Sequence, residues 1–223
     1  MEKRGRAAHP SVLEEASTRI GHMATIMLLH SVLGLRPGVI AAADRLRAAG
    51  HTVHTPDLFE GEDILDDYPA AMARVERIGR KELMARARAV AETQPADLVY
   101  AGFSMGAGFA AMLAVTRPGA RAVLFLHDNF DPVYLPVPSW PAGVAAQIHC
   151  MANDPWSDGP EVIAKLAAFI EAGPAECDVF DYPGSAHLFT DPSLPAEFDP
   201  QAAELLWTRV IDFLVRLDAG AAR

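Results

Sequence analysis

The stretch Gly102-Phe103-Ser104-Met105-Gly106 decides the fold of this chain. It follows the apolar run 98–101 and precedes the small-residue run 107–114, so it joins a predicted buried strand to a predicted helix. The five residues read GxSxG, a pattern in which the glycines leave room for a sharp turn and the central residue takes a strained backbone conformation. The pattern predicts that Ser104 is a nucleophile projecting above a sheet, although it also occurs in ordinary strand-turn-helix connections.

A nucleophilic serine of this type needs a histidine base and a carboxylate that orients the histidine, in the chain order Ser, acid, His. Asp154 follows the predicted strand 145–151, and His187 follows the predicted strand 177–182. Loops after parallel strands open at one edge of the sheet, so the three side chains can meet. We therefore predict that Ser104, Asp154 and His187 form a catalytic triad.

The two partners of Ser104 have alternatives. His187 could be an ordinary histidine of a surface loop, and Asp154 a carboxylate that stabilises a turn. Asp128 and Asp131 follow the preceding predicted strand, from which an acid can also reach the histidine. The position of a histidine after the last strand favours His187 as the general base.

A second group of residues is predicted to stabilise a negatively charged oxygen. The backbone N–H of Met105 opens the helix after the nucleophile, and a second N–H should come from Val32 or Leu33 in the loop after the first strand. His30 ends that strand. It is a candidate substrate-pocket residue, which either shapes this loop or is a hydrogen-bonded structural histidine.

The segment 128–143 is a long loop that contains four prolines, so it cannot enter a sheet. It follows a strand and is expected to rise at the edge that carries the triad. Its aromatic residues Phe130, Tyr134 and Trp140, together with Trp156, either line an apolar substrate pocket or pack under the loop.

Strand and helix patterns alternate through most of the chain, which predicts an α/β fold with a mostly parallel sheet flanked by helices on both faces. Gly79 is expected to interrupt a long helical segment, and Asp158 to cap the helix that begins at Pro160. The predicted strands are 25–30, 51–55, 98–101, 122–126, 145–151 and 177–182, and the predicted helices are 39–49, 69–93, 106–116, 160–172 and 202–217.

Composition restricts the class of protein. A chain of 223 residues, 51% hydrophobic, can bury one sizeable core, so a single domain over residues 23–223 is expected. The formal net charge of −10 disfavours nucleic acid and anionic membranes as partners. No membrane-spanning stretch is present and residues 1–22 lack the apolar core of a secretory signal, which favours the cytoplasm. These 22 residues are a native extension or an engineered junction.

No cofactor or metal is implied by the motifs. His51 and His54 point to opposite faces of a strand, and Asp63, Asp66 and Asp67 lack the spacing of a calcium loop. No dinucleotide fingerprint or phosphate-loop lysine accompanies the glycines at 106 and 108. The two cysteines are predicted to be buried thiols.

Together, the elbow 102–106, Asp154 after a strand and the run Tyr182-Pro183-Gly184-Ser185-Ala186-His187-Leu188-Phe189 resemble the dienelactone hydrolase family of α/β-hydrolases. The stretch Thr55-Pro56-Asp57-Leu58-Phe59 is also similar to that family. The resemblance extends from about Met23 to about Leu217, and it implies a single-domain α/β-hydrolase fold and hydrolytic activity.

Three differences concern the substrate. The namesake enzymes carry a cysteine in the elbow and a glutamate in the first loop, whereas this chain has Ser104 and no acid between Ser31 and Leu35. Asp191 lies just beyond the predicted base, where those enzymes hold a substrate carboxylate with arginine. Unless Arg36 or Arg80 reaches the pocket, these differences predict a preference for neutral substrates.

The sequence therefore predicts a cofactor-free serine hydrolase that cleaves a small ester, thioester or lactone through an acyl-enzyme, as a monomer or homodimer. A ligand-binding protein without catalysis and an acyltransferase are the alternatives.

Overall fold

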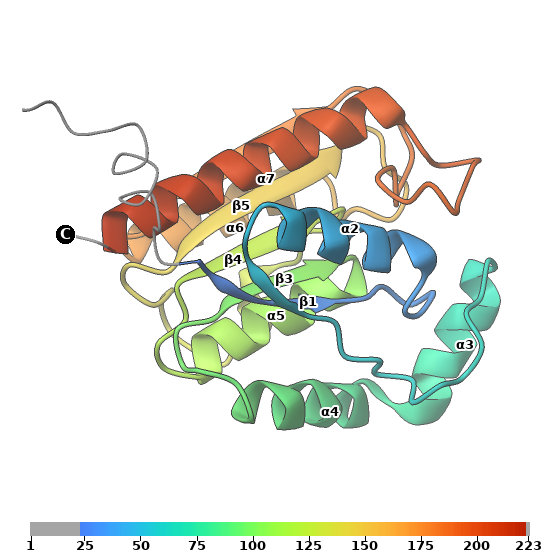
Figure 1. The fold of residues 1–223 in the computed structure, drawn as a ribbon, viewed down its shortest axis with the longest axis horizontal. Coiled ribbons are helices and arrows are strands. Elements are labelled where there is room, and N and C mark those ends of the chain that lie inside the picture. The colour runs from blue at the N-terminus through green and yellow to red at the C-terminus, as the bar shows by residue number, and fades with distance from the viewer. Residues whose placement is uncertain (1–22, 222–223) are drawn as a thin grey trace, which may run out of the picture.

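Six parallel strands form one sheet at the centre of the molecule, in the order β2-β1-β3-β4-β5-β6 (Figure 1). The computed structural model describes residues 23–221, so the predicted N-terminal extension lies outside the described residues. All six predicted strands are present. Their bounds are β1 Thr25–Leu29, β2 Thr52–His54, β3 Val99–Phe103, β4 Ala122–Leu126, β5 Ala145–Met151 and β6 Cys177–Tyr182.

Helices cover both faces of this sheet, which confirms the predicted α/β class. On one face, α2 and α7 lie side by side, where Arg45 and Glu204 form an ion pair of 2.7 Å (Figure 1). The helix α5 packs on β1, β3 and β4, and α6 packs on β5 and β6. The helices are α2 Pro37–Ala48, α3 Tyr68–Ile78, α4 Arg80–Glu92, α5 Met105–Thr116, α6 Pro160–Ala172 and α7 Pro200–Ala221.

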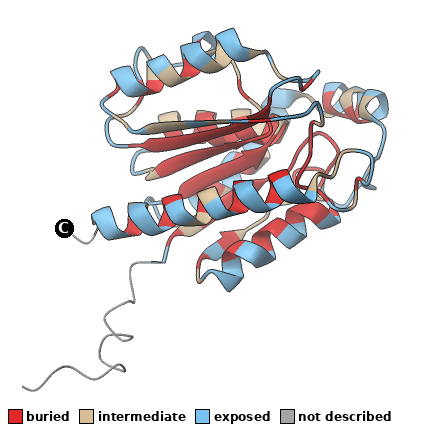
Figure 2. Cartoon of the chain, turned by 90° about the horizontal axis from the view of Figure 1, so that it is seen from above, coloured by how far each residue is buried: buried red, intermediate tan, exposed pale blue. Residues whose placement is uncertain are grey.

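The core lies between the sheet and these helices. Figure 2 shows the inner strands of the sheet as buried and the outward faces of the surrounding helices as exposed. Every residue of β3, β4 and β5 is buried, as expected for strands covered on both sides. None of the helices in residues 23–221 is long and apolar enough to cross a bilayer.

Two local expectations have different outcomes. Gly79 separates α3 from α4 with a φ of 91°, a conformation that glycine adopts without strain, so the predicted interruption is confirmed. Asp158 does not cap α6, because Gly159 occupies the N-cap position and no side chain bonds there. Both cysteines are free; Cys150 in β5 is buried as predicted, whereas Cys177 is only half-buried, because β6 is an edge strand.

Close packing at the elbow explains both glycines of the GxSxG motif. A Cβ on Gly106 would lie 2.5 Å from the carbonyl oxygen of Leu29 and 2.7 Å from that of His30. A Cβ on Gly102 would collide with the backbone of Gly106. The start of α5 therefore touches the end of β1, which brings the elbow against the loop 30–36.

We expect Gly106→Ala to lower the free energy of unfolding by about 1–3 kcal/mol, because the obstructing atoms are backbone and cannot rotate away. Gly108→Ala in the same helix is the matched control. A Cβ at Gly108 meets nothing within 4 Å, so alanine there should stabilise the helix by about 0.5–1 kcal/mol. Urea denaturation measures both values, and equal stabilities for the two variants would contradict this packing.

Candidate active site

Ser104 lies in the strained turn between β3 and α5. Its φ of 51° and ψ of −121° fall outside the regions that L-residues prefer. Its backbone N–H donates to the carbonyl of Leu126 at 2.9 Å, which ties the turn to the end of β4. The side chain thereby stands at the carboxyl edge of the sheet.

His187 connects Ser104 to Asp154 by two short hydrogen bonds. Its Nε2 lies 2.8 Å from Ser104 Oγ, and its Nδ1 lies 2.6 Å from Asp154 Oδ2. A carboxylate only accepts hydrogen bonds, so Nδ1 carries the proton and Nε2 of the neutral ring accepts from the hydroxyl. The three residues predicted from loops far apart in sequence are therefore adjacent.

Asp154 is fixed on both oxygens and shielded from water. Its Oδ1 accepts the backbone N–H of Trp156 at 2.9 Å, while Oδ2 contacts His187. The side chain is 0% exposed, and that of His187 is 2% exposed. Burial of this kind strengthens the interaction between the carboxylate and the imidazole.

The alternative acids lie elsewhere. Asp131 is paired with Lys165 at 2.6 Å on the surface, and Asp128 accepts the N–H of Asn129 at 2.8 Å. Within residues 23–221, neither is hydrogen-bonded to His187. Asp128 is still close enough for His187 to lower its pKa, but burial dominates and raises that pKa to about 7.

The two predicted donors of the loop 30–36 differ in their partners. Leu33 donates its N–H to Ser31 Oγ at 3.2 Å, so of the two candidates from this loop it already has a partner. The N–H of Val32 has no acceptor within residues 23–221 although the residue is only 5% exposed. The N–H of Met105 belongs to the first turn of α5, where helices have no internal acceptor. Val32 and Met105 are thus the available donors.

His30 is completely buried, and both of its ring nitrogens are occupied. Leu58 donates its N–H to Nε2 at 3.0 Å, so Nδ1 carries the proton and donates to the carbonyl of Ser31 at 2.7 Å. Burial lowers its pKa, which favours the neutral ring. The structure thus places His30 under the loop and not in a pocket wall.

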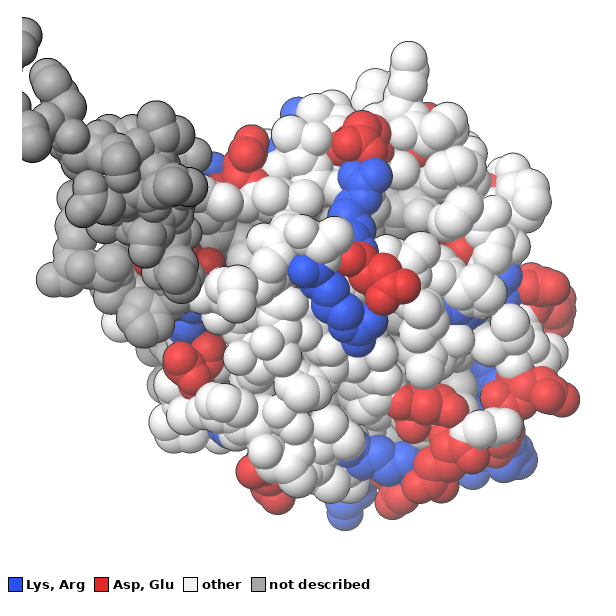
Figure 3. Space-filling view, viewed as in Figure 1, with Lys and Arg blue, Asp and Glu red and all other residues white. Residues whose placement is uncertain are grey.

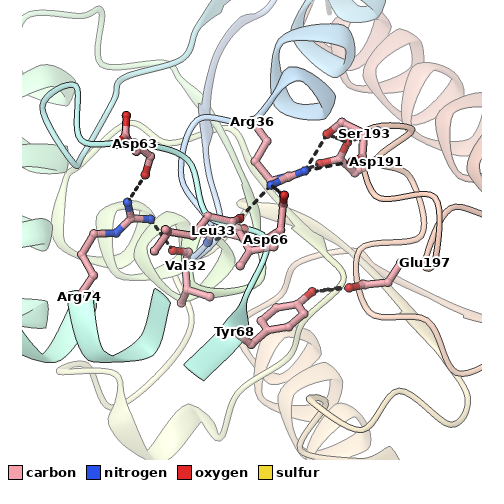
Figure 4. Close-up of polar contacts among 12 residues, drawn as sticks. Val32, Leu33, Arg36, Asp63, Asp66, Tyr68, Arg74, Asp191, Ser193 and Glu197 are labelled. Atoms are coloured by element: carbon pink, nitrogen blue, oxygen red, sulfur yellow. Dashed lines mark hydrogen bonds and ion pairs between the residues drawn. The ribbon is translucent and has the colours of Figure 1, made fainter. Parts of the chain in front are cut away.

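Two aromatic rings cover the imidazole of His187. The ring of Tyr68 lies 4.7 Å from that of Trp156 and 6.0 Å from that of His187. Trp156, predicted as a pocket residue, is 47% exposed. Tyr68 is anchored through its hydroxyl, which donates to Glu197 at 2.9 Å, and Glu197 also accepts the N–H of Leu188 at 2.6 Å (Figure 4).

The proline-rich loop contributes less than expected. Trp140 is 2% exposed and donates to the carbonyl of Val144 at 2.7 Å, just before the start of β5, so it lies at the opposite edge of the sheet from the triad. Phe130 packs on Phe125 in the core, and Tyr134 is 74% exposed. Trp140 and Phe130 therefore pack under the loop, the second of the two expectations.

Arg36 is occupied by acidic and carbonyl groups. Its guanidinium bonds Asp191 at 3.1 Å, Asp66 at 2.5 Å, the carbonyl of Leu65 and both oxygens of Ser193 (Figure 4). Arg36 is 2% exposed. It joins three loops, and the charge of Asp191 is neutralised by it.

Several residues around the triad carry no sequence motif. Tyr68 and Glu197 meet across 129 residues, and Arg74 reaches the loop 30–36 from α3. His127 has a φ of 62° and stacks on Phe103 of the elbow. Tyr68 begins a helix and His127 follows a strand. These positions are a weak sequence signal that the two residues lie near the site.

Comparison with known proteins agrees with this architecture. The sequence profile of the dienelactone hydrolase family matches residues 13–217. The chain belongs to the dienelactone hydrolase family. It is therefore a hydrolase on the α/β-hydrolase fold, and the resemblance predicted from its motifs is confirmed.

One relative and two solved structures are similar to this chain. A carboxymethylenebutenolidase of Rhodococcus opacus is 27% identical, over 93% of this chain and 87% of the relative. The solved structure of a dienelactone hydrolase-like promiscuous phosphotriesterase from metagenomic libraries has a TM-score of 0.70 and 18% identity, covering 90% of this chain and 89% of the other. The structure named m3DLH has a TM-score of 0.70 and 20% identity, with 88% of each chain covered. Both structures share the fold.

The raised pKa of Asp128 predicts a pH-dependent stability difference. The folded protein keeps this proton up to about pH 7, whereas the unfolded chain loses it near the ordinary aspartate pKa of about 4. Between these values the folded state binds more protons, so rising pH destabilises the wild type. Asp128→Asn should therefore become more stable relative to the wild type as the pH rises from 5 to 8. Urea denaturation at both pH values checks this, and a difference independent of pH would contradict it.

Proposed function

We propose that this member of the dienelactone hydrolase family is a serine hydrolase that cleaves a carboxylic ester, thioester or lactone. The observation that carries the proposal is the hydrogen-bond chain from Ser104 through His187 to Asp154. This hydrogen-bond chain contains the nucleophile, the general base and the orienting carboxylate that acyl transfer by a serine requires. The family provides the hydrolytic class.

The first half of the reaction forms an acyl-enzyme. His187 Nε2 takes the hydroxyl proton while Ser104 Oγ attacks the carbonyl carbon, whose π electrons move onto oxygen. The tetrahedral intermediate then collapses: the oxyanion electrons re-form the carbonyl, the bond to the leaving group breaks, and Nε2 donates its proton to the leaving group. Asp154 stabilises the imidazolium and keeps Nδ1 protonated.

Water completes the cycle by the same steps. His187 removes a proton from water, which attacks the acyl-enzyme, and the released Oγ recovers the proton from Nε2. During both halves the negative oxygen needs donors. The N–H groups of Val32 and Met105 are proposed for this role, and each such donor typically contributes about 3 kcal/mol.

Substitutions of the triad should separate the three roles. Ser104→Ala is expected to abolish turnover, a loss on the order of 10⁶-fold, because it removes the nucleophile. His187→Ala should be comparably inactive. Asp154→Asn should lower kcat by about 10³- to 10⁴-fold through the wrong imidazole tautomer. Hydrolysis of p-nitrophenyl acetate measures each rate.

Two controls make this series decisive. The melting temperature of Ser104→Ala should equal that of the wild type, since alanine fits the elbow. Asp131→Asn changes a partly exposed acid of the neighbouring loop, which is paired with Lys165, and should leave kcat unchanged. Full activity of Ser104→Ala would contradict the serine mechanism, and an inactive Asp131→Asn beside an active Asp154→Asn would reassign the acid.

The charges near the site favour a neutral substrate. Figure 3 shows acidic side chains gathered over α3 and the loop before it, at the lower right of the molecule. The exposed acids of this loop are Glu60, Glu62, Asp63, Asp66 and Asp67. Of the cations expected near the pocket, Arg36 is paired with two carboxylates, and Arg80 is exposed at the start of α4. The side chains that lie next to His187 are aromatic, namely Tyr68 and Trp156.

We therefore expect kcat/KM to be at least about tenfold higher for neutral short-chain esters than for dienelactone, equivalent to roughly 1.4 kcal/mol of transition-state binding. The physical reason is that a substrate carboxylate would be desolvated here beside exposed acids, while Arg36 is already paired with two carboxylates. Steady-state kinetics on both substrates with one preparation test this. A preference for the anionic lactone would show that a cation does enter the pocket.

A further inference from the structure

Arg74 is a buried arginine without a carboxylate partner. It lies on α3 and is 6% exposed, and no ion pair to it occurs within residues 23–221. Its guanidinium lies 3.8 Å from the centre of the Phe59 ring and donates to two backbone carbonyls, those of Asp63 at 2.5 Å and Val32 at 3.1 Å (Figure 4). Buried charges are usually paired, because desolvation otherwise costs stability. Arg36, the neighbouring buried arginine, is paired twice.

The bond from Arg74 acts on the residue that offers the free N–H. Val32 lies between two peptide groups, and both of their carbonyls accept side-chain hydrogen bonds. The carbonyl of Ser31, in the peptide that carries the N–H of Val32, accepts from His30 Nδ1. The carbonyl of Val32 accepts from Arg74 Nη2. The orientation of both peptide groups, and therefore of the N–H of Val32, is fixed from both sides.

The rest of the loop is held by other groups. The carbonyl of Leu33 accepts the N–H of Leu65 at 3.2 Å, and that of Gly34 accepts the N–H of Arg36 at 2.8 Å. The chain turns at Gly34 with a φ of 97°. The carbonyls from Ser31 to Gly34 thus all have donors, whereas the buried N–H of Val32 has no acceptor within the described residues. Because buried N–H groups rarely lack a partner, this donor is available to a group outside the loop.

We propose that Arg74 is the positioning residue of the oxyanion hole, and that its unpaired positive charge stabilises the negative oxygen through the Val32 peptide. This inference rests on the proposed function, because it requires an anionic tetrahedral intermediate at Ser104. Arg74 touches the backbone of the donor and not the substrate. Within the described residues no carboxylate forms an ion pair with it, and Asp57 and Glu62 act on it only at longer range, so its field also acts on negative charge that develops nearby.

A role of this kind affects the transition state more than the bound ester. Arg74→Met removes both the charge and the hydrogen bond, and it should lower kcat about 10- to 100-fold while KM changes less than about threefold. Arg74→Gln keeps an amide donor without charge and should be intermediate. Arg74→Lys keeps the charge and one donor, and it should recover kcat to within about fivefold of the wild type.

An inhibitor that mimics the intermediate provides an independent readout. n-Butylboronic acid adds reversibly to a serine hydroxyl and forms an anionic tetrahedral adduct. Its inhibition constant should rise in Arg74→Met by the same factor by which kcat/KM falls. A residue that only supports the fold would not produce this proportionality together with a constant KM.

The matched control is Arg77→Met, in the next turn of the same helix. Arg77 is paired with Glu62 at 2.6 Å and its side chain is 61% exposed, so this change should leave kcat and boronate inhibition unaltered. If Arg74→Met does not fold, the comparison of Arg74→Gln with Arg74→Lys decides, with the glutamine variant expected to be slower and to bind boronate more weakly.

Two results would overturn the inference. One is that Arg74→Met, or Arg74→Gln if the former does not fold, keeps kcat and the boronate inhibition constant within twofold of the wild type. The other is a loss of kcat that Arg74→Lys does not restore. Failure of the proposed function is seen separately, as turnover retained in Ser104→Ala.

Discussion

The contact between Gly106 and the carbonyl groups at the end of β1 is the constraint on which the site depends. Because no Cβ intervenes, the start of α5 lies directly against Leu29 and His30. This contact brings the strained turn at Ser104 next to the loop 30–36, which contains the free N–H of Val32. The nucleophile and the proposed oxyanion donors are thus placed by backbone packing, before any side chain of the site is considered.

Around this contact, long-range side-chain bonds hold loops that would otherwise be independent. Arg36 joins the loop 30–36 to the loop before α3, which carries the exposed acids, and to the segment after His187. Glu197 joins the residue after His187 to the first turn of α3 through Tyr68. A rigid arrangement of this kind keeps catalytic groups within hydrogen-bond distance, which is the condition for efficient proton transfer. The sheet positions the strand ends, and these bonds position the loops.

The strands, the helices and the adjacency of Ser104, His187 and Asp154 could be predicted from sequence, because each depends on local patterns and on one topological rule. Apolar runs predict buried strands, and parallel strands place the loops that follow them at one edge. Pairings such as Tyr68 with Glu197 and Arg74 with Val32 depend on how loops fold back, which no local pattern encodes. For the same reason the sequence leaves two positions open for Trp140, in the pocket or packed under its loop, and the structure places it at the edge of the sheet opposite the triad.

The central claim is that Ser104 is the nucleophile, and trapping its adduct tests this most directly. Treatment with a fluorophosphonate followed by intact-mass measurement and peptide mapping should give one adduct per chain, located on Ser104 and absent from Ser104→Ala. Loss of esterase activity should follow the extent of labelling. A protein that remains fully active when labelled at Ser104, or that carries the adduct on another residue, would contradict the account.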